Sequence, residues 1–448
     1  MIARLHGVSG LPTAEDHQIA WLRKRAPTLG WPLALIGAWL IATPASAQLL
    51  RGLGGAVSGL PSTISGTLGD VRHVTDQTVD DLSSTTSQFS RDRLGDLARE
   101  YPRALEFDDK GAVVVRGEVL AISPSPASLD IAAKAGFSVL RDSRLDSLDL
   151  DLVTLATPKG VSAREALRRL RALDPDGRYD LDHLYAGAGE GLAASRPAAD
   201  PGAPQGAGVR IGLLDTGIDR GHPAFAASTI EQRGFAPGGV TPAAHGTAVA
   251  SLMIGQAHGF HGAAPGASLL AADVYGAGPT GGSADAIVQG LAWMAENHVR
   301  VINMSLVGPP NLTLEVSVRA LVKRGVLIVA PVGNDGPAAP PLYPAAYPGV
   351  VAVTGVDRRG KVLVEAGRAG HVDFAAPGAD LEAARAGGGF ARVRGTSFAA
   401  PIVAGRLADV LRGEDRAATA RALAALAEEA RQAAGVVGRD VALADQGR

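Results

Sequence analysis

Short runs of apolar residues alternate with helical patterns in the second half of the chain. Five runs consist mainly of Val, Ile, Leu and Ala, at residues 209–214, 269–274, 299–304, 326–331 and 350–356. Continuous apolar runs of this length are typical of strands that are buried on both faces. Residues 284–297 and 314–324, between these runs, have helical patterns. Such an alternation predicts an α/β domain in which helices cover both faces of a mainly parallel sheet.

A different order of elements, β-α-β-β-α-β, is predicted for residues 113–185. Strands are expected at 113–122, 137–140, 148–155 and 179–184, and helices at 127–135 and 163–173. The third strand alternates Leu with Ser and Asp, which is typical of a half-buried strand. Ser162 followed by Glu165 resembles a capping box at the start of the second helix. This order predicts a small ferredoxin-like α+β unit.

The remaining segments lack sustained periodicity. Residues 48–112 are polar, with a Ser/Thr cluster at 83–87, and are predicted to be a spacer that becomes helical near residues 91–101. Residues 186–207 are rich in Ala, Gly and Pro and are predicted to be an exposed linker. The expected organisation is therefore a leader, a spacer, the α+β unit, a linker and the α/β domain, at residues 1–47, 48–112, 113–185, 186–207 and 208–448.

The leader has the layout of a secretory signal. Arg23-Lys24-Arg25 precedes an apolar stretch at 31–42, and Ala45-Ser46-Ala47 supplies small residues where a signal is cleaved. The apolar stretch is shorter than the roughly 20 residues that a membrane span needs. We therefore predict export to the periplasm or out of the cell. The alternative is an uncleaved segment that anchors the chain in the membrane, and a start downstream of Met1 would explain the long leader.

Composition excludes several functions. Lys and Arg number 43 against 45 for Asp and Glu, a formal net charge of −2, so the chain lacks the basic excess typical of nucleic-acid binders. We therefore expect no nucleic-acid partner. Cysteine is absent from the sequence, which excludes a thiol nucleophile, a Cys-ligated zinc and any disulfide.

Three polar segments lie at the junctions between predicted strands and helices. Asp215-Thr216-Gly217 directly follows the strand at 209–214, and His245-Gly246-Thr247 leads into a small apolar run. Ser397, in Gly395-Thr396-Ser397, opens an Ala-rich helix that continues to about residue 412. Each segment alone has an ordinary explanation, as a turn Asp, a capping or core His and an N-capping Ser. Because sites in such sheets form at the carboxyl ends of strands, together they indicate one shared site.

Asn334 completes this set of residues. It follows the strand at 326–331, in Val332-Gly333-Asn334, where a side-chain amide can donate to an oxyanion. Asp, His, Asn and Ser in this order, in the motifs Asp-Thr-Gly, His-Gly-Thr, Gly-Asn and Gly-Thr-Ser, resemble the subtilisin family (subtilases, peptidase S8). The similarity covers about residues 208–439 and includes His222-Pro223, Ala264-Pro265-Gly266 and Asn303-Met304-Ser305. It implies a subtilisin-like three-layer fold and a serine endopeptidase that acts on polypeptides.

The resemblance also implies a role for each residue. Ser397 would be the nucleophile, His245 the general base, and Asp215 the group that orients the imidazole ring. The Asn334 side chain and the Ser397 backbone N–H would bind the oxyanion. No cofactor is required for this chemistry. Many relatives bind a structural calcium ion, but no Asp-rich loop in this sequence identifies ligands, so we assign no metal residues.

The same resemblance implies a meaning for residues 113–185. Subtilases commonly carry a ferredoxin-like pro-domain that assists folding and blocks the cleft until it is cut away. The chain would then be a zymogen, with its own pro-domain as an intramolecular inhibitor and residues 186–207 as the maturation region. The alternative is an accessory domain that stays attached.

The expected substrate pocket departs from the family pattern. One wall would be Ser305, Leu306 and Val307, the other Val332 and Gly333, and the floor Leu342. In the family, Gly is usual at the positions of Val307 and Leu342, and Ala-Ala at those of Pro331 and Val332. Each change adds side-chain volume, which predicts a shallow pocket that prefers Ala or another small residue at P1, the residue before the scissile bond. Loop shifts that move Val307 or Leu342 out of the pocket would remove this preference.

Two other functions compete with an endopeptidase. The first is a non-catalytic, exported binding protein on a protease fold, which is disfavoured because no expected catalytic position is substituted. The second is a lipase or esterase. Those enzymes usually carry Gly-x-Ser-x-Gly with the His last in the chain, whereas here Ser397 is last, in the context Gly-Thr-Ser-Phe-Ala.

Overall fold

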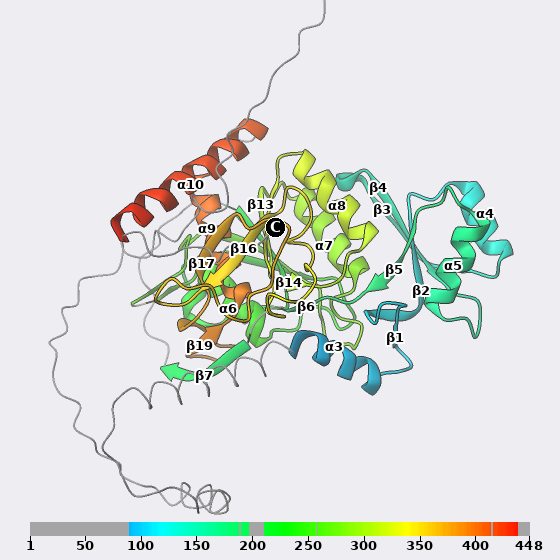
Figure 1. Ribbon diagram of the computed structural model, residues 1–448, viewed down its shortest axis with the longest axis horizontal. Helices are drawn as coiled ribbons and strands as arrows, with labels where there is room; N and C mark the ends of the chain where they lie inside the picture. Colours follow the sequence, from blue (N-terminus) through cyan, green and yellow to red (C-terminus); the bar gives the residue numbers. More distant parts are fainter. Residues whose placement is uncertain (1–88, 188–189, 197–209, 258, 414, 438–448) are drawn as a thin grey trace, which may run out of the picture. The chain divides into compact units, whose positions relative to one another are not determined.

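The computed structural model describes residues 89–187, 190–196, 210–257, 259–413 and 415–437 (Figure 1). The chain divides into two compact units, and all of these residues belong to one of them. The second unit, Leu22–Leu82, and the predicted signal segment at 1–47 lie outside the described residues. None of the helices in the described part is long and apolar enough to cross a membrane.

A seven-stranded sheet forms the centre of the α/β domain, and all of its neighbouring strands are parallel. In spatial order the strands are β17 (Phe374–Pro377), β16 (Val351–Val356), β15 (Leu327–Pro331), β13 (Val301–Met304), β8 (Arg210–Asp215), β12 (Ser268–Asp273) and β9 (Ile230–Gly234). The five apolar runs of the sequence supply the five inner strands, and β17 and β9 are added at the edges. The predicted α/β class with a mainly parallel sheet is confirmed.

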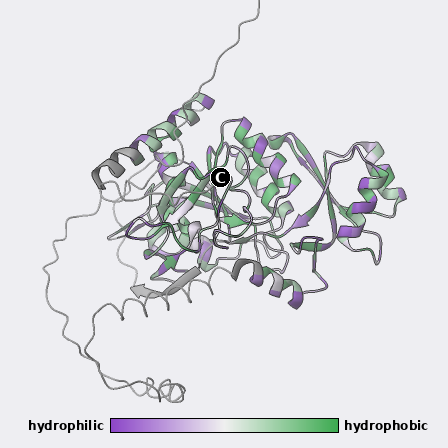
Figure 2. Cartoon of the chain, viewed as in Figure 1, coloured by the Kyte–Doolittle hydropathy of each residue, from purple (hydrophilic) through white to green (hydrophobic). Residues whose placement is uncertain are grey.

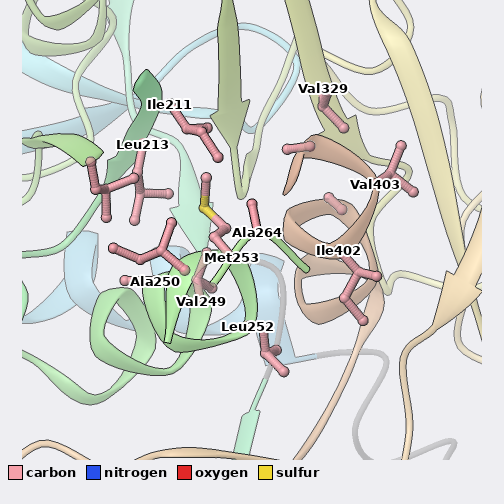
Figure 3. Packing of buried hydrophobic residues seen from close by; sticks show 14 of the residues in the cluster. Ile211, Leu213, Val249, Ala250, Leu252, Met253, Ala264, Val329, Ile402 and Val403 are labelled. Atoms are coloured by element: carbon pink, nitrogen blue, oxygen red, sulfur yellow. The ribbon is translucent and has the colours of Figure 1, made fainter. Parts of the chain in front are cut away.

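Side chains from the two faces of this sheet belong to two separate hydrophobic cores, because successive side chains in a strand point to opposite sides. From β8, Ile211 and Leu213 join the core under α6 (Ala244–Ile254) and α9 (Thr396–Val410), as Figure 3 shows. Leu214 joins the core under α7 (Ala284–Glu296) and α8 (Leu312–Lys323). Figure 2 shows hydrophobic and hydrophilic residues alternating along α7 and α8. Each fully buried Ile or Leu contributes roughly 1.5–3 kcal/mol, so both faces stabilise the sheet.

The α+β unit (residues 105–183) is an antiparallel sheet with two helices. Its strands follow the order β1 (Leu105–Phe107), β2 (Val113–Ile122), β4 (Leu150–Ala156) and β3 (Ser138–Leu145), and β5 (Tyr179–His183) also pairs with β2. Helices α4 (Pro126–Lys134) and α5 (Ala163–Leu173) pack on it. The predicted order β-α-β-β-α-β is confirmed, and β1 extends it into the predicted spacer. Helix α3 (Phe89–Glu100) precedes β1, where the sequence indicated a helix near 91–101.

Two local predictions in this unit need correction. The strand predicted from residue 148 begins at Leu150, because Leu148 ends a 3₁₀ turn and Asp149 is left-handed with φ of 54°. Asp tolerates that conformation better than most residues. The predicted capping box is only half formed: Ser162 accepts the Glu165 N–H at 3.4 Å, while the Glu165 carboxylate binds Arg168 and Arg169.

The segment predicted to be an exposed linker instead contains two paired strands. β6 (Ala186–Gly187) pairs with β14 (Leu306–Val307). β7 (Glu190–Arg196) pairs with β19 (Phe390–Arg394), which also pairs with β18 (Leu381–Ala384). These partners are far away in the sequence, so local periodicity gave no sign of them. Residues 197–207 of the predicted linker lie outside the described residues. The other elements are β10 (Gln256–Ala257), β11 (Phe260–His261) and α10 (Arg416–Val437).

Candidate active site

Three polar side chains converge at the carboxyl end of the central sheet. Asp215 is the last residue of β8, and His245 and Ser397 are the second residues of α6 and α9. His245 Nδ1 lies 2.8 and 2.9 Å from the two carboxylate oxygens of Asp215. His245 Nε2 lies 3.0 Å from Ser397 Oγ. The structure therefore brings the three residues together in one chain of hydrogen bonds.

A close backbone approach positions this imidazole ring. A Cβ on Gly246 would lie 2.3 Å from the carbonyl oxygen of Thr216, so only glycine allows α6 to begin this near the end of β8. The Gly246 N–H donates to Thr216 Oγ1 at 2.9 Å, and the Thr216 N–H donates to Asp215 Oδ1 at 2.7 Å. Asp215 and Ser397 are buried, whereas the His245 side chain is 16% exposed. The imidazole ring therefore keeps some contact with solvent, while the carboxylate is shielded from water.

Asn334 lies between the end of β15 and the start of α9. Its Oδ1 accepts the backbone N–H of Thr396 at 3.0 Å. The preceding Gly333 has φ of 91°, a conformation that favours glycine. Asn334 and His245 line the same cavity. The residues that precede α6 and α9, Ala243 and Gly395, make no side-chain capping bond, so first-turn N–H groups of these helices are accepted by side chains of distant segments, Thr216 and Asn334.

The expected substrate wall on β14 is tied to α9. Ser305 Oγ donates to the carbonyl oxygen of Ser397 at 3.0 Å and accepts from Asn303 Nδ2 at 2.7 Å. Ser305 thus supports the backbone beside the candidate nucleophile. Leu306 and Val307 form the strand that pairs with β6. The wall is therefore already occupied by another segment of the same chain.

Two of the side chains that depart from the family pattern lie together. Val307 and Leu342 are both buried and pack together in a small cluster of their own. A Cβ on Gly333 would lie 2.5 Å from Leu342 Cδ1 and 3.5 Å from Val307 Cγ1. Three of the six expected pocket residues therefore meet at one point. Val332 does not join them, because its side chain is buried in the core under α7 and α8.

A cavity of about 610 Å³ lies beside the imidazole ring of His245. His245, Asn334 and Gly395 line it from the α/β domain, and Ala186 and Gly187 line it from β6. Helix α3 contributes five more lining residues, namely Arg93, Leu94, Asp96, Leu97 and Glu100. Two segments that precede the α/β domain in the sequence therefore border the cavity, and the sequence signalled neither placement.

An ion pair also borders this cavity and was missed by the sequence reasoning. Arg394 Nε lies 2.7 Å from Glu365 Oε1, and Arg394 donates a second bond to Glu365 Oε2 at 2.9 Å. Glu365 is buried, and Arg394 lies three positions before Ser397. No motif marked either residue, because charged residues 29 positions apart carry no common pattern.

The α+β unit contacts the α/β domain through carboxylates of β5. Asp180 Oδ2 accepts the Leu312 N–H at the start of α8, and Asp182 Oδ1 accepts the Asp285 N–H at the start of α7, the latter at 2.9 Å. Carboxylates at helix N-termini are favourable because the N–H groups there lack intrahelical partners. Arg141 of β3 forms an ion pair with Asp285. As for metals, the described residues contain no group of three or more His, Asp or Glu that could hold an ion.

The comparisons with known proteins agree with this geometry. The model of the subtilase family matches residues 206–443. The chain belongs to the subtilase family. Within the family, subtilisin Savinase of Lederbergia lenta is 38% identical over 221 residues, which cover 47% of this chain and 79% of that protein. An alkaline protease of Shouchella clausii is also 38% identical over 221 residues, but these cover only 56% of that relative.

A solved structure shows the same fold at lower identity. Fervidolysin from Fervidobacterium pennivorans, a keratinolytic enzyme related to subtilisin, superposes with a TM-score of 0.55 at 20% identity. The match covers 68% of this chain and 56% of that one. The family resemblance drawn from the sequence is thus confirmed, and this subtilase is a serine endopeptidase.

Proposed function

We propose that Ser397, His245 and Asp215 form the catalytic triad of this subtilase. The observation that carries the proposal is the position of His245, whose two ring nitrogens lie within 3.0 Å of Asp215 and Ser397. Ser397 Oγ attacks the scissile carbonyl carbon while His245 Nε2 accepts its proton and passes it to the leaving amine. Asp215 holds the Nδ1–H tautomer and stabilises the imidazolium. Water then cleaves the acyl-enzyme, with His245 again as the base.

The oxyanion of each tetrahedral intermediate is bound by the Asn334 amide and the Ser397 backbone N–H. Support comes from the Asn334–Thr396 hydrogen bond, which fixes the amide beside the first turn of α9. Gly395, which precedes α9, has no side chain to cap the helix, and the N-terminus of α9 adds the positive end of the helix dipole. All of these groups belong to the protein, so the chemistry requires no cofactor. A structural calcium ion, if bound, would act on stability alone.

The α+β unit acts as a pro-domain, and the full chain is a zymogen. Support comes from β6, which directly follows this unit and pairs with the substrate wall on β14. Gly187 of β6 lies against the imidazole, since a Cβ there would be 3.4 Å from Cε1 and Nδ1 of His245. A polypeptide substrate cannot bind while β6 holds this place. A permanently attached accessory domain would leave the same cleft blocked, which argues against that alternative.

The enzyme prefers small residues at P1. The packed pair Val307 and Leu342 supports this preference, because a large side chain would have to displace one of them.

The enzyme acts in the periplasm or outside the cell. Support comes from residues 1–47, which have the layout of a secretory signal. If that segment is retained, the enzyme is anchored in the membrane.

Labelling with a fluorophosphonate probe tests the triad. We expect residues 48–448 to be labelled after incubation at neutral pH, and Ser397→Ala to remain unlabelled. Ser268→Ala is a matched control, since Ser268 lies at the amino end of β12, the end of the strand away from the site. Absence of labelling in the wild type, together with no hydrolysis of casein, would favour a non-catalytic binding protein.

A further inference from the structure

The cavity beside His245 carries few charged groups on the side of the α/β domain. Three of its described lining residues are charged residues of α3, which precedes the α+β unit and is removed with it if the proposed zymogen matures. Among the described lining residues of the α/β domain, only Glu365 and Arg394 have an acidic or a basic side chain. A substrate in the open cleft would therefore meet a single ion pair.

The two partners of this ion pair differ in exposure. The Glu365 side chain is 5% exposed, whereas that of Arg394 is 36% exposed. The buried carboxylate is held by two hydrogen bonds, from Arg394 Nε at 2.7 Å and from Arg394 Nη2 at 2.9 Å. The guanidinium group thus covers the carboxylate, and it is the charged group of the pair that a substrate can reach.

The Arg394 guanidinium keeps donors for a second partner. It has five N–H groups in one plane, and Glu365 takes one from Nε and one from Nη2. The other three, on Nη1 and Nη2, have no further acceptor within the described part of the chain. Two adjacent nitrogens of a guanidinium match the two oxygens of a carboxylate. Because Glu365 already fixes the plane of the group, this edge is oriented before a ligand binds.

The strand pairing indicates which part of a substrate meets Arg394. β6 pairs with the expected substrate wall on β14, and the next strand of the chain, β7, pairs with β19. A polypeptide that follows the same path passes β14 before the nucleophile and β19 after it. Arg394, the last residue of β19, is therefore on the side of the leaving amine.

The register of β19 supports an acidic residue on this side. Residues directly opposite each other in an antiparallel pair have their side chains on the same face of the sheet. The position opposite Arg394 is occupied by Glu190 of β7. The segment that borders the cleft thus has an acidic residue at the register position that a guanidinium would favour.

We propose that Arg394 is a specificity-determining residue, which selects polypeptides with an Asp or Glu among the first three residues after the scissile bond. This inference rests on the proposed triad. The substrate carboxylate accepts N–H groups from Nη1 and Nη2 of Arg394, and Glu365 positions the guanidinium from behind. A substrate Lys at the same place would bring its ammonium group to N–H donors, while the Glu365 carboxylate stays out of its reach.

A set of quenched fluorescent peptides tests this preference. The peptides differ only in having Glu, Gln or Lys at one of the first three positions after the scissile bond, and mass spectrometry confirms the bond that is cut. The enzyme is residues 48–448 after incubation at neutral pH. At one or more positions we expect kcat/KM to be about fivefold higher for Glu than for Gln, and lowest for Lys, since the site is partly screened by water. The preference should shrink in roughly 1 M NaCl, where charges are screened beyond about 3 Å.

Two changes of the ion pair assign the preference to Arg394. Arg394→Gln should bring the Glu-to-Gln ratio of kcat/KM close to one. The double variant Glu365→Arg with Arg394→Glu keeps an ion pair and should prefer Lys over Glu. Because each ratio is measured on one enzyme sample, a smaller folded fraction does not alter it. Arg412→Gln is the matched control: Arg412 is exposed and lies beyond the far end of α9, a helix of 15 residues or about 22 Å.

The possible results separate this inference from the proposed protease function. Equal kcat/KM for Glu and Gln at all three positions, in an enzyme that the fluorophosphonate probe labels, would overturn the inference and leave the triad intact. An unchanged ratio in Arg394→Gln, or an equal loss in Arg412→Gln, would overturn the assignment to Arg394. No hydrolysis of any peptide, together with no labelling, would overturn both proposals.

Discussion

Asn334 accepts a hydrogen bond at 3.0 Å from the backbone N–H of Thr396, 62 positions further along the chain. The bond joins the end of β15 to the start of α9, the two segments that supply the proposed oxyanion donors. The Thr396 backbone thus fixes the orientation of the Asn334 side-chain amide before any substrate binds. Donors that are fixed in advance need no reorganisation when the negative charge forms.

Replacing Asn334 should therefore affect the chemical step rather than substrate binding. We expect Asn334→Ala to lower kcat by about 10²–10³-fold with little change in KM, because the donor acts on a charge that forms only in the transition state. Asn334→Asp keeps an oxygen that can accept the Thr396 N–H but loses the donor. Peptide hydrolysis by both variants decides the matter, since full activity in Asn334→Asp would show that only the bond to Thr396 is needed.

Asp215→Asn should lower kcat by about four orders of magnitude, because an amide at this place no longer holds the Nδ1–H tautomer or stabilises the imidazolium. Steady-state hydrolysis of a peptide substrate measures the effect. Asp273→Asn is the control: Asp273 is aligned with Asp215 on the neighbouring strand but accepts only backbone N–H groups, from Thr241, Tyr275 and Gly276. Its kcat should stay near that of the wild type. An equal loss in both variants would point to damage at the end of the sheet.

Val307→Gly should widen the pocket beside Leu342. We expect kcat/KM for a Leu or Phe at P1 to rise by about tenfold or more relative to Ala, since a few methylene groups in an apolar pocket give discrimination of this size. A set of peptides that differ only at P1 provides the measurement. Val362→Gly, at an exposed position, should leave the ranking unchanged. A wild-type enzyme that already prefers Phe or Leu would contradict the filled pocket.

Docking of the pro-domain should weaken as the pH rises. Burial raises the pKa of Asp182 well above its usual value, helped by the nearby Asp285, and burial also raises the pKa values of Asp285 and Glu118. Arg141 and Gln289 oppose the shift at Asp285. The docked form therefore binds protons that the separated parts release. The contribution of these groups to docking is fully present below the ordinary pKa of an exposed Asp, about 4, and is lost as the pH rises through the raised values.

Asp182→Asn tests this coupling, because the amide oxygen can still accept the Asp285 N–H but carries no charge. We expect tighter inhibition by the pro-domain at neutral pH and a smaller change between pH 5 and 8, with Glu118 and Asp285 responsible for what remains. The inhibition constant of the cleaved pro-domain across this range gives the answer. Asp151→Asn, at an exposed position on β4, should follow the wild type. A steeper pH dependence in Asp182→Asn would contradict the sign of the effect.

Removal of metal ions should leave the chemical step unchanged. The proposed reaction uses only side chains and backbone N–H groups, so we expect the initial rate of peptide hydrolysis to be the same within minutes of adding EDTA. A slow loss of activity at higher temperature, reversed by calcium, would indicate a structural ion. An immediate loss would contradict the proposed chemistry.

The sequence was sufficient for those parts of the molecule that depend on local patterns. Apolar runs predicted the five inner strands, and the chain order of Asp215, His245, Asn334 and Ser397 predicted the site. The motif glycines have direct structural reasons, as at Gly246, where any side chain would collide with Thr216. These steric requirements act between residues of the motifs themselves, and the motifs therefore reveal them in the sequence.

The remaining features depend on contacts between distant segments. β6 and β7 are strands only because β14 and β19 lie beside them, and the segment itself is rich in Ala and Gly. Val332 was expected in the pocket, but its side chain packs into the core. The ion pair of Glu365 and Arg394 likewise joins a turn to the last residue of β19. No local pattern determines such contacts, because tertiary structure alone brings the partners together.

Asp180 and Asp182 belong to the proposed pro-domain, and their carboxylates accept N–H groups at the starts of α8 and α7 of the protease domain. Maturation of the proposed zymogen removes this unit. Once that unit has been removed, the N–H groups of Leu312 and Asp285 lose these acceptors and bind water instead. The mature protease then lacks contacts that stabilise it while it folds. We expect it to refold poorly by itself after denaturation, whereas the full chain refolds. Folding would then be a one-way process, and the unfolding rate would set the working lifetime of the mature enzyme.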